Sequence, residues 1–475
     1  MIRLLPCAAL LLPVILAAAG APRPLRPGTE LFVDDARIAR RENVTRTTHP
    51  ARKPPRPVLE PDRPWEAGRV YVYGTVHRDA AGRFHLWYTA PAKMLYATSP
   101  DGLNWTKPEL DVATHEGRRT NIVFPVSHGG AVLVDEAESD PARRYKALIA
   151  EPIRVGGFSG YFSADGIHWT RYGHDRILTV GSEIGQVVRD PATGKYLGYI
   201  RPYPPRHFPK STREKRLGAV VTSDDFVHWS EMKVVLEPDA VDDAWVTRPG
   251  QRTEFYGMSG FPYGQSYLGL VPVFRVTGIH ETVGQEQSRY DGPMHGELIT
   301  SRDGLTWARM AERTPIIPSG PDFDRSVMHT GVAPLIVGDE VWHYYTGINT
   351  THGGPIPPKR ITVCLAKWRL DGFVSLDAGP AEGVIETTPL APPGGSLEVN
   401  ADCRRGTLVV EALDAATGAV VPGYAATDAE PVTGDQLRAQ VRWKNYTALP
   451  ADRSVRLRFR LRSGQLYSYT LGAGK

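Results

Sequence analysis

The sequence has little cysteine, a single long apolar run and almost no excess of one charge. Three cysteines in 475 residues are too few for a disulfide-stabilised scaffold. We find no structural zinc motif, no phosphate-binding glycine loop and no His-Glu-x-x-His segment, so we predict no metal site and no cofactor. The net charge of +4 is spread along the chain, which argues against a nucleic-acid partner.

The one long apolar run lies at the N-terminus. It extends from Leu4 to Ala19, after a short basic start and before the small residues up to Ala21. This order is typical of a secretory signal peptide, and the run is shorter than the roughly 20 residues that a membrane span needs. We therefore expect residues 1–21 to be a signal peptide, the protein to be secreted or periplasmic, and no membrane span. Its removal would leave Cys364 and Cys403, either as two buried thiols or as a disulfide.

Glycine and proline, in contrast, are abundant, with 47 and 41 residues, which disfavours long helices and favours short strands joined by turns.

A seven-residue pattern, Ser-x-Asp-Gly-x-x-Trp, recurs about every 60 to 80 residues, which suits one propeller blade with long loops. The copies are Ser99 to Trp105, Ser163 to Trp169, Ser223 to Trp229, which has Phe226 at the Gly position, and Ser301 to Trp307, with a degenerate fifth at Asp371-Gly372-Phe373. Because Ser, Asp and Gly are turn residues, we interpret these aspartates as structural.

Aromatic strand segments bounded by Asp and Gly turns precede each copy, as in 85–88 and 342–345. Five such units predict an all-β fold, a five-bladed β-propeller over residues 22–390. After residue 390 the pattern stops, and alternating runs such as 455–461 predict a small C-terminal β-sandwich over residues 391–475. We expect residues 30–35 or 383–386 to complete the last blade, because an open ring would expose strand edges.

The repeated turns, the five blades and the appended sandwich resemble the five-bladed propeller glycoside hydrolases, such as invertases, fructanases, arabinanases and xylosidases. The segments 31–35, 371–376 and 455–459 are also similar to exported bacterial proteins described as glycosyl hydrolases. The resemblance implies a monomeric enzyme that cleaves a poly- or oligosaccharide with two carboxyl groups at the propeller axis. The chain departs from invertases in lacking an Asn-Asp-Pro-Asn-Gly segment, and its Arg189-Asp190-Pro191 precedes a hairpin turn.

Three acids are the candidates for catalysis. Glu183 and Glu254 belong to the expected inner strands of blades 3 and 4, where burial among apolar side chains would favour a protonated acid. Asp35 stands where the resembling families place their base or nucleophile. We rank Glu183 first as the acid. The alternative for Asp35 and its neighbour Asp34 is a strand-end pair that caps the backbone or binds Arg37.

Other residues are candidates for substrate binding. Glu66 is a substrate contact or a further acid, and Trp65 offers a stacking surface for a sugar ring. Arg201 heads a basic loop that suits an anionic sugar. His329 could bind a sugar hydroxyl, with a structural histidine as the alternative. Asp34 completes the set.

Two other functions remain open. One is a carbohydrate-binding propeller without catalysis, and the other is a sialidase-like or phosphorolytic enzyme that acts on an anionic sugar. Convergence of two of the candidate carboxyl groups at the axis would favour hydrolysis, whereas a cluster of Arg and His would favour an anionic ligand. A structural calcium ion on the axis is compatible with the fold, but no motif demands it.

Overall fold

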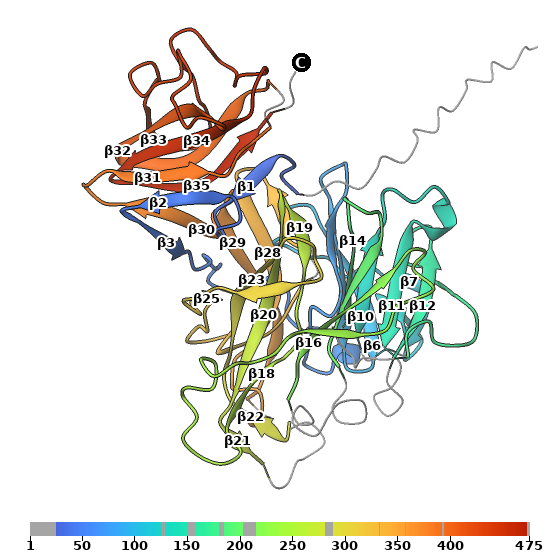
Figure 1. Cartoon of the computed structure of the whole chain (residues 1–475). Helices are drawn as coiled ribbons and strands as arrows, with labels where there is room; N and C mark the ends of the chain where they lie inside the picture. The colour runs from blue at the N-terminus through green and yellow to red at the C-terminus, as the bar shows by residue number, and fades with distance from the viewer. Residues whose placement is uncertain are drawn as a thin grey trace, which may run out of the picture.

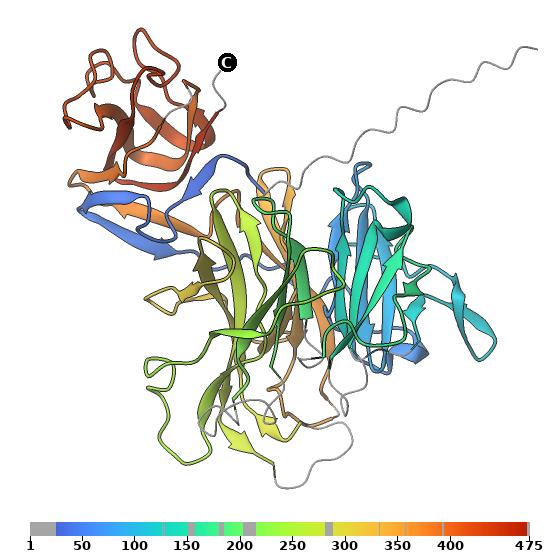
Figure 2. The same cartoon turned by 45° about the vertical axis from the view of Figure 1, so that its right-hand side comes forward.

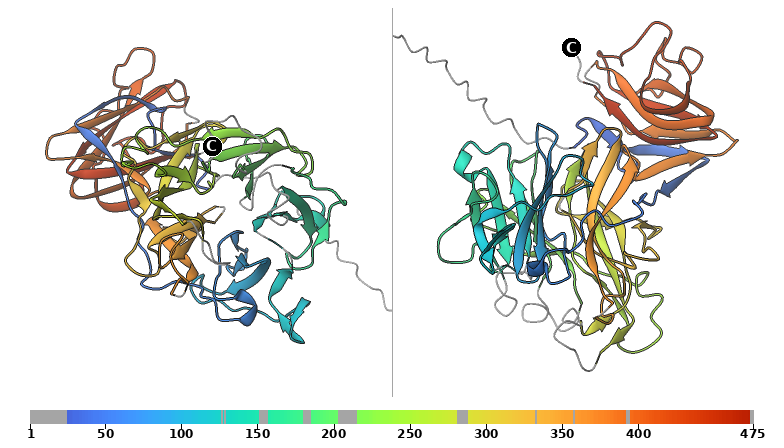
Figure 3. Two further views of the ribbon diagram at one scale, coloured as in Figure 1. Left: turned by 90° about the horizontal axis from the view of Figure 1, so that it is seen from below. Right: turned by 180° about the vertical axis from the view of Figure 1, so that it is seen from behind.

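The computed structural model describes residues 25–125, 127, 129–150, 157–179, 185–202, 215–280, 288–331, 333–356, 358–391 and 394–472. Over these ranges the chain is all-β, with two short 3-10 helices, η1 (Pro64–Glu66) and η2 (Pro141–Arg143). Five antiparallel sheets surround a common axis, as Figure 3 shows, and a further β domain lies beside them. This confirms the predicted five-bladed propeller with a C-terminal β domain. No helix within the described ranges is long and apolar enough to cross a membrane.

The five blades are consecutive in the chain, and each starts with a strand near the axis (Figure 1). Blade 1 comprises β4 (Val76–Arg78), β5 (Phe84–Ala90), β6 (Lys93–Ser99) and β9 (Ile122–Phe124). Blade 2 comprises β10 (Gly130–Val134), β11 (Tyr145–Ala150), β12 (Phe158–Ser163) and β13 (Thr170–Arg171). Blade 3 comprises β14 (Gly185–Arg189), β15 (Tyr196–Ile200), β16 (Gly218–Ser223) and β17 (Lys233–Leu236).

Blades 4 and 5 have interrupted strands. Blade 4 comprises β18 (Arg252–Phe255), β19 (Phe261–Tyr263), β20 (Ser266–Val276), β23 (Met294–Ser301), β24 (Trp307–Arg309) and β25 (Pro315–Ile317). Blade 5 comprises β26 (Ser326–Thr330), β27 (Leu335–Val337), β28 (Glu340–Ile348) and β29 (Ile361–Arg369). Two small hairpins are added, β7 (Leu110–His115) with β8 (Arg118–Thr120) and β21 (Gly278–Ile279) with β22 (Tyr290–Asp291).

The repeated Ser-x-Asp-Gly turn is held by its own side chains. In blade 2 the Ser163 hydroxyl accepts from the Gly166 amide at 2.9 Å, and Asp165 accepts from the amides of residues 167 and 168, both at 2.8 Å. Gly166 has a φ of +76°, a conformation that glycine adopts without strain. Asp101, Asp225 and Asp303 accept the equivalent backbone bonds. The turn aspartates are therefore structural.

Each turn also contacts the preceding blade. The carbonyl of Gly166 accepts from Trp87 Nε1 of blade 1 at 2.7 Å, and the carbonyl of Gly102 accepts from the Tyr344 hydroxyl of blade 5 at 2.8 Å. In blade 4 the carbonyl of Gly304 accepts from the Tyr199 hydroxyl of blade 3 at 3.1 Å. A buried aromatic donor thus reaches the turn of the next blade, and the motif joins neighbouring blades.

The ring is closed by an N-terminal segment. Arg52 and Lys367 of β29 exchange backbone hydrogen bonds of 2.8 and 2.9 Å, and the amide of Val363 donates to the carbonyl of Leu59 at 2.9 Å. Residues 52–59 therefore form the outer edge of blade 5. The prediction that residues 30–35 or 383–386 close the last blade was wrong, because both segments pair within the C-terminal domain.

The C-terminal domain is one nine-stranded sheet that folds into two layers (Figure 2). The 18-residue strand β32 pairs with β33 and β35 through its first part and with β34 through its second part, so it belongs to both layers. The strands are β1 (Thr29–Leu31), β2 (Ile38–Glu42), β3 (Val44–Thr48), β30 (Val374–Ala378), β31 (Gly383–Thr387), β32 (Leu397–Asp414), β33 (Val432–Gln440), β34 (Val455–Arg462) and β35 (Gly464–Leu471). The domain therefore draws strands from both sides of the predicted boundary at residues 390 and 391.

The fifth copy of the turn joins the two domains. Asp371 is completely buried and accepts hydrogen bonds from the guanidinium of Arg26, the hydroxyl of Tyr263 in blade 4 and the hydroxyl of Ser468 in β35. Its side chain thus bonds the propeller to the C-terminal sheet. Cys364 in β29 and Cys403 in β32 are buried free thiols, so no disulfide contributes to this junction.

Replacement of Gly166 by alanine should destabilise the propeller. A Cβ atom there would lie 2.6 Å from Cζ2 of Trp87 and 2.9 Å from Cδ1 of Tyr145, in addition to the strain of a positive φ. Gly173→Ala is the matched control, because its φ is +60° and nothing lies within 4 Å of the added Cβ. Urea unfolding should show a further loss of about 1–3 kcal/mol in Gly166→Ala relative to the control. Equal losses in the two variants would contradict the proposed contact between blades.

A buried histidine should make the fold sensitive to acid. His343 in β28 is 1% exposed, neither ring nitrogen has a partner among the described residues, and burial lowers its pKa to about 3. Because the unfolded chain binds a proton near the ordinary pKa of 6.5 and the folded chain does not, stability falls as the pH drops below about 6.5, by up to about 1.4 kcal/mol per pH unit. His343→Leu should weaken this acid dependence in urea unfolding at pH 7.5 and 5. The exposed His174→Leu control should retain it.

Candidate functional site

A cavity of about 450 Å³ opens at one end of the propeller axis. Blade 1 contributes Tyr71 and Tyr73, blade 4 contributes Tyr256, and blade 5 contributes Met328. Tyr71 and Tyr73 precede β4, Tyr256 follows β18, and Met328 lies within β26. Figure 1 shows this end, marked by β21 and β22, on the side of the ring away from the C-terminal domain. The remaining lining residues are Arg69, Thr89, Ala90, Pro91, Ala92, Ser288, His352, Lys359 and Ile361.

Three tyrosines give the cavity its aromatic walls. The rings of Tyr71 and Tyr73 are stacked, with centroids 5.3 Å apart and an angle of 13° between their planes. Tyr256 packs against Phe274 and His352 on the opposite side, in blade 4. Flat aromatic faces combined with polar groups are the surfaces on which ring-shaped polar ligands bind.

His352 has a structural role in the wall. Its Nδ1 is 2.8 Å from the carbonyl oxygen of Tyr290, so this nitrogen donates, and its Nε2 then accepts from the Tyr256 hydroxyl at 2.9 Å. Burial and, to a smaller extent, the nearby charge of Arg216 lower the pKa of His352 to about 3. The imidazole is therefore neutral and fixes the position of the Tyr256 ring.

Two cations, Arg69 and Lys359, line the cavity, and neither forms an ion pair with a described carboxylate. Lys359 donates its ammonium to the backbone carbonyl of His352, and burial together with the charge of Arg69 lowers the pKa of Lys359 to about 8. Arg69 is held at the cavity by the backbone, because the amide of the next residue, Val70, bonds to the carbonyl of Ile361 at 3.1 Å. None of the described lining residues is Asp or Glu.

Glu254, one of the predicted catalytic acids, lies on β18 and is completely buried. Its two carboxylate oxygens bind different guanidinium groups, Arg216 on one side and Arg252 at 2.7 Å on the other. Arg201, predicted to contact an anionic sugar, is also buried and stacks on the Tyr256 ring at 4.9 Å. The structure thus brings Arg201 beside the cavity, whereas Glu254 neutralises two arginines behind it.

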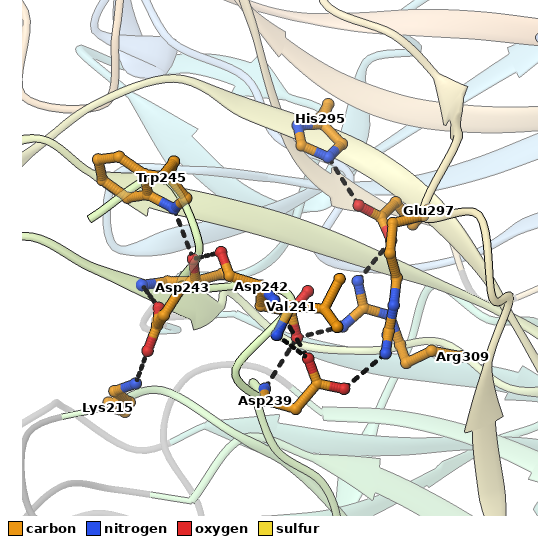
Figure 4. A network of polar contacts seen from close by, with 11 residues as sticks. Lys215, Asp239, Val241, Asp242, Asp243, Trp245, His295, Glu297 and Arg309 are labelled. Atoms are coloured by element: carbon orange, nitrogen blue, oxygen red, sulfur yellow. Dashed lines mark hydrogen bonds and ion pairs between the residues drawn. The ribbon is translucent and has the colours of Figure 1, made fainter. Parts of the chain in front are cut away.

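A second polar network, shown in Figure 4, supports β18 from the neighbouring loop. Asp243 accepts from the Thr253 amide at 2.7 Å and pairs with Lys215 at 2.6 Å. Arg309 bridges Asp242 and Glu297, which in turn binds His295. These contacts fix the strand that carries Arg252 and Glu254.

The other predicted acids lie elsewhere. Asp34 pairs with Arg302 and Asp35 with Arg46, beside the β1 strand of the C-terminal domain. The alternative of a backbone cap is met, because Asp34 accepts from the Ala36 amide at 2.9 Å, whereas the arginines that bind Asp34 and Asp35 are Arg302 and Arg46. Neither carboxylate lines the cavity.

Glu66 and Trp65 belong to η1, at the outer part of blade 1. Glu66 is completely buried and binds the Tyr88 hydroxyl and Lys107, both at 2.7 Å. Trp65 donates to Asn121 at 2.8 Å. Neither residue lines the cavity, so the structure gives Glu66 a buried ion pair and Trp65 a hydrogen bond within the blade.

Two predicted residues cannot be placed. Glu183 lies outside the described residues, two positions before β14. His329 lies on β26, next to the lining residue Met328, but its side chain is outside the described part of the chain. Among the described residues, no three His, Cys, Asp or Glu side chains are placed to hold a metal ion.

Sequence reasoning missed Arg69, Lys359, His352 and the tyrosines of blade 1. One signal was present: Val70-Tyr71-Val72-Tyr73 alternates as an inner strand does, with Arg69 just before it. No comparable signal marks Lys359. It lies in the loop between the end of β28 and the start of β29, and this loop borders the cavity.

No protein-family model and no curated protein sequence matches the chain. Solved structures with a similar arrangement include a β-fructofuranosidase of Bombyx mori, 11% identical over 88% of this chain and 94% of that one, with a TM-score of 0.40. An α-L-arabinofuranosidase of Podospora anserina is 14% identical over 66% of this chain and 96% of that one, with a TM-score of 0.42. An N-acetylgalactosamine deacetylase from F. plautii is 13% identical over 74% and 96%, with a TM-score of 0.41. Likeness of this degree assigns no reaction to this chain.

Loss of the Glu254 charge should destabilise the fold. Glu254→Gln would leave Arg216 and Arg252 buried beside each other without a counter-charge, which should lower the free energy of unfolding by about 3 kcal/mol. Glu109→Gln, at an exposed position, is the control and should be neutral. An unchanged urea midpoint in Glu254→Gln would contradict the role of a counter-ion.

Proposed function

We propose that this chain is a carbohydrate-active enzyme that cleaves a glycosidic bond in the cavity at the propeller axis. The observation that carries the proposal is the composition of that cavity: the stacked rings of Tyr71 and Tyr73, Tyr256 opposite, and hydrogen-bond donors between them. Sugar rings present C–H faces that pack on aromatic rings and hydroxyls that bind polar groups. A volume of about 450 Å³ suits a short part of a glycan chain.

Glu183 remains our candidate for the general acid. Its support is the direction of β14, which begins at the cavity end: Gly185 pairs with Ile200, and the next residue, Arg201, stacks on the lining residue Tyr256. The chain therefore enters blade 3 from the side on which a substrate would bind. Because none of the described lining residues is acidic, hydrolysis by two carboxyl groups requires that both come from residues beyond the described part of the lining.

The surrounding charges also favour the second candidate function, action on an anionic sugar. Arg69 and Lys359 line the cavity, and Arg201 lies behind Tyr256. A cluster of this kind is the feature that we expected for an anionic ligand. We also propose that the enzyme acts outside the cytoplasm, where glycan polymers occur. The support for this location is the signal peptide expected at residues 1–21.

The proposal is tested by assaying release of reducing ends from a panel of neutral and acidic glycans. Wild-type protein should cleave at least one glycan, and Glu183→Gln should lower its kcat by about 10²–10⁴-fold, the usual contribution of a general acid. Glu231→Gln, at an exposed position after the blade 3 turn, should leave the rate unchanged. Unchanged turnover in Glu183→Gln would reject this acid, and binding without cleavage by the wild type would favour a carbohydrate-binding module.

A further inference from the structure

The cavity holds two like charges, and neither forms an ion pair with a described residue, although the charge of Asp291 acts favourably on Lys359. The guanidinium of Arg69 forms no ion pair and no side-chain hydrogen bond with any described residue, and Lys359 binds only the uncharged carbonyl of His352. Their separation is short enough for the charge of Arg69 to lower the pKa of Lys359. Like charges held together at a partly buried site repel each other, and this cost is removed when an anion lies between them.

The nearby carboxylates are already engaged. Glu254 is shared by Arg216 and Arg252. Asp291 accepts from the amides of Gly292 and Gly353, at 2.7 and 2.8 Å, and lies 3.6 Å from His280. Among the described side chains around the cavity, the cations Arg69, Lys359, Arg216 and Arg252 outnumber the anions Glu254 and Asp291, so these residues contribute a net positive charge.

The two side chains have no evident structural task. The backbone of residues 69 and 70, and not the Arg69 side chain, pairs with Ile361 to close the ring. The Lys359 side chain bonds within the loop 349–360, to the carbonyl of His352. This loop is anchored independently, because its Gly353 amide donates to Asp291 and the ring nitrogens of His352 bond to Tyr290 and Tyr256. The placement of both cations is therefore better explained by a ligand than by folding.

We propose that Arg69 and Lys359 form a subsite for an anionic substituent, a carboxylate or a sulfate ester, on the sugar that Tyr71 and Tyr73 contact. The planar guanidinium offers paired donors to two oxygens of such a group, and the ammonium adds a compact charge. The inference rests on the proposed carbohydrate function and narrows its substrates to acidic glycans.

Calorimetric binding tests the subsite separately from catalysis. The probes are an oligogalacturonide with its carboxyl-reduced counterpart, and a sulfated oligosaccharide with its desulfated counterpart, titrated into the full chain carrying Glu183→Gln. We expect the acidic member of at least one pair to bind about tenfold or more tightly than its neutral partner, which corresponds to about 1.4 kcal/mol. The pair that shows the preference distinguishes carboxylate from sulfate.

Variants then assign the preference to the two residues. Lys359→Gln and Arg69→Gln should each reduce the ratio of affinities, and the double variant should bring it to about one, whereas Lys359→Arg should preserve it. Lys233→Gln, at an exposed position on β17, controls for the loss of one positive charge and should retain the full ratio.

Several outcomes would overturn the subsite: equal binding of acidic and neutral probes, no binding of any probe, or a preference that survives in the double variant. These results are distinguishable from failure of the proposed function. Cleavage of neutral glycans without an acidic preference rejects the subsite alone, and a preference that depends on Lys359 without release of reducing ends rejects the hydrolysis alone.

Discussion

The pairing of residues 52–59 with β29 is the interaction on which the rest of this structure depends. It supplies the outer edge of blade 5 from a segment that precedes blade 1, so the five sheets become a closed ring. After η1 the chain returns to the start of β29, where Arg69 forms a parallel bridge with Ile361 and the Val70 amide bonds to the Ile361 carbonyl. Closure of the ring therefore also forms the cavity, because the first and last blades each contribute part of the cavity wall.

The repeated turn acts at the scale of the whole ring. Within a blade its Ser and Asp bond to the local backbone, and between blades its carbonyl accepts from a buried aromatic donor. Phe226 in blade 3 takes the glycine position with a φ of +70° and fills the contact with its own ring, against Phe162 and Tyr196. In the fifth copy Asp371 bonds to Arg26, Tyr263 and Ser468, so the motif that joins blades also joins the domains.

The candidate carboxylates that the structure describes form ion pairs within the fold and lie outside the cavity lining. Asp34, Asp35, Glu66 and Glu254 are all engaged with arginine or lysine, and none lines the cavity. The described part of the cavity lining is instead basic and aromatic, and it includes Arg69, Lys359 and three tyrosines. An inner strand can thus carry an acid, as β18 carries Glu254, without directing its carboxylate towards the axis.

The sequence by itself determined the five blades, because turn chemistry and strand alternation are local properties that each repeat displays in full. It also determined that the turn aspartates are structural. Tertiary structure alone decided which segment closes the ring, because residues 30–35 show the strand signal but pair in the C-terminal domain, whereas residues 52–59 show no such signal and pair with β29. It alone also decided which charges meet, because Arg69 and Lys359 are 290 positions apart and approach each other only when the ends of the ring join.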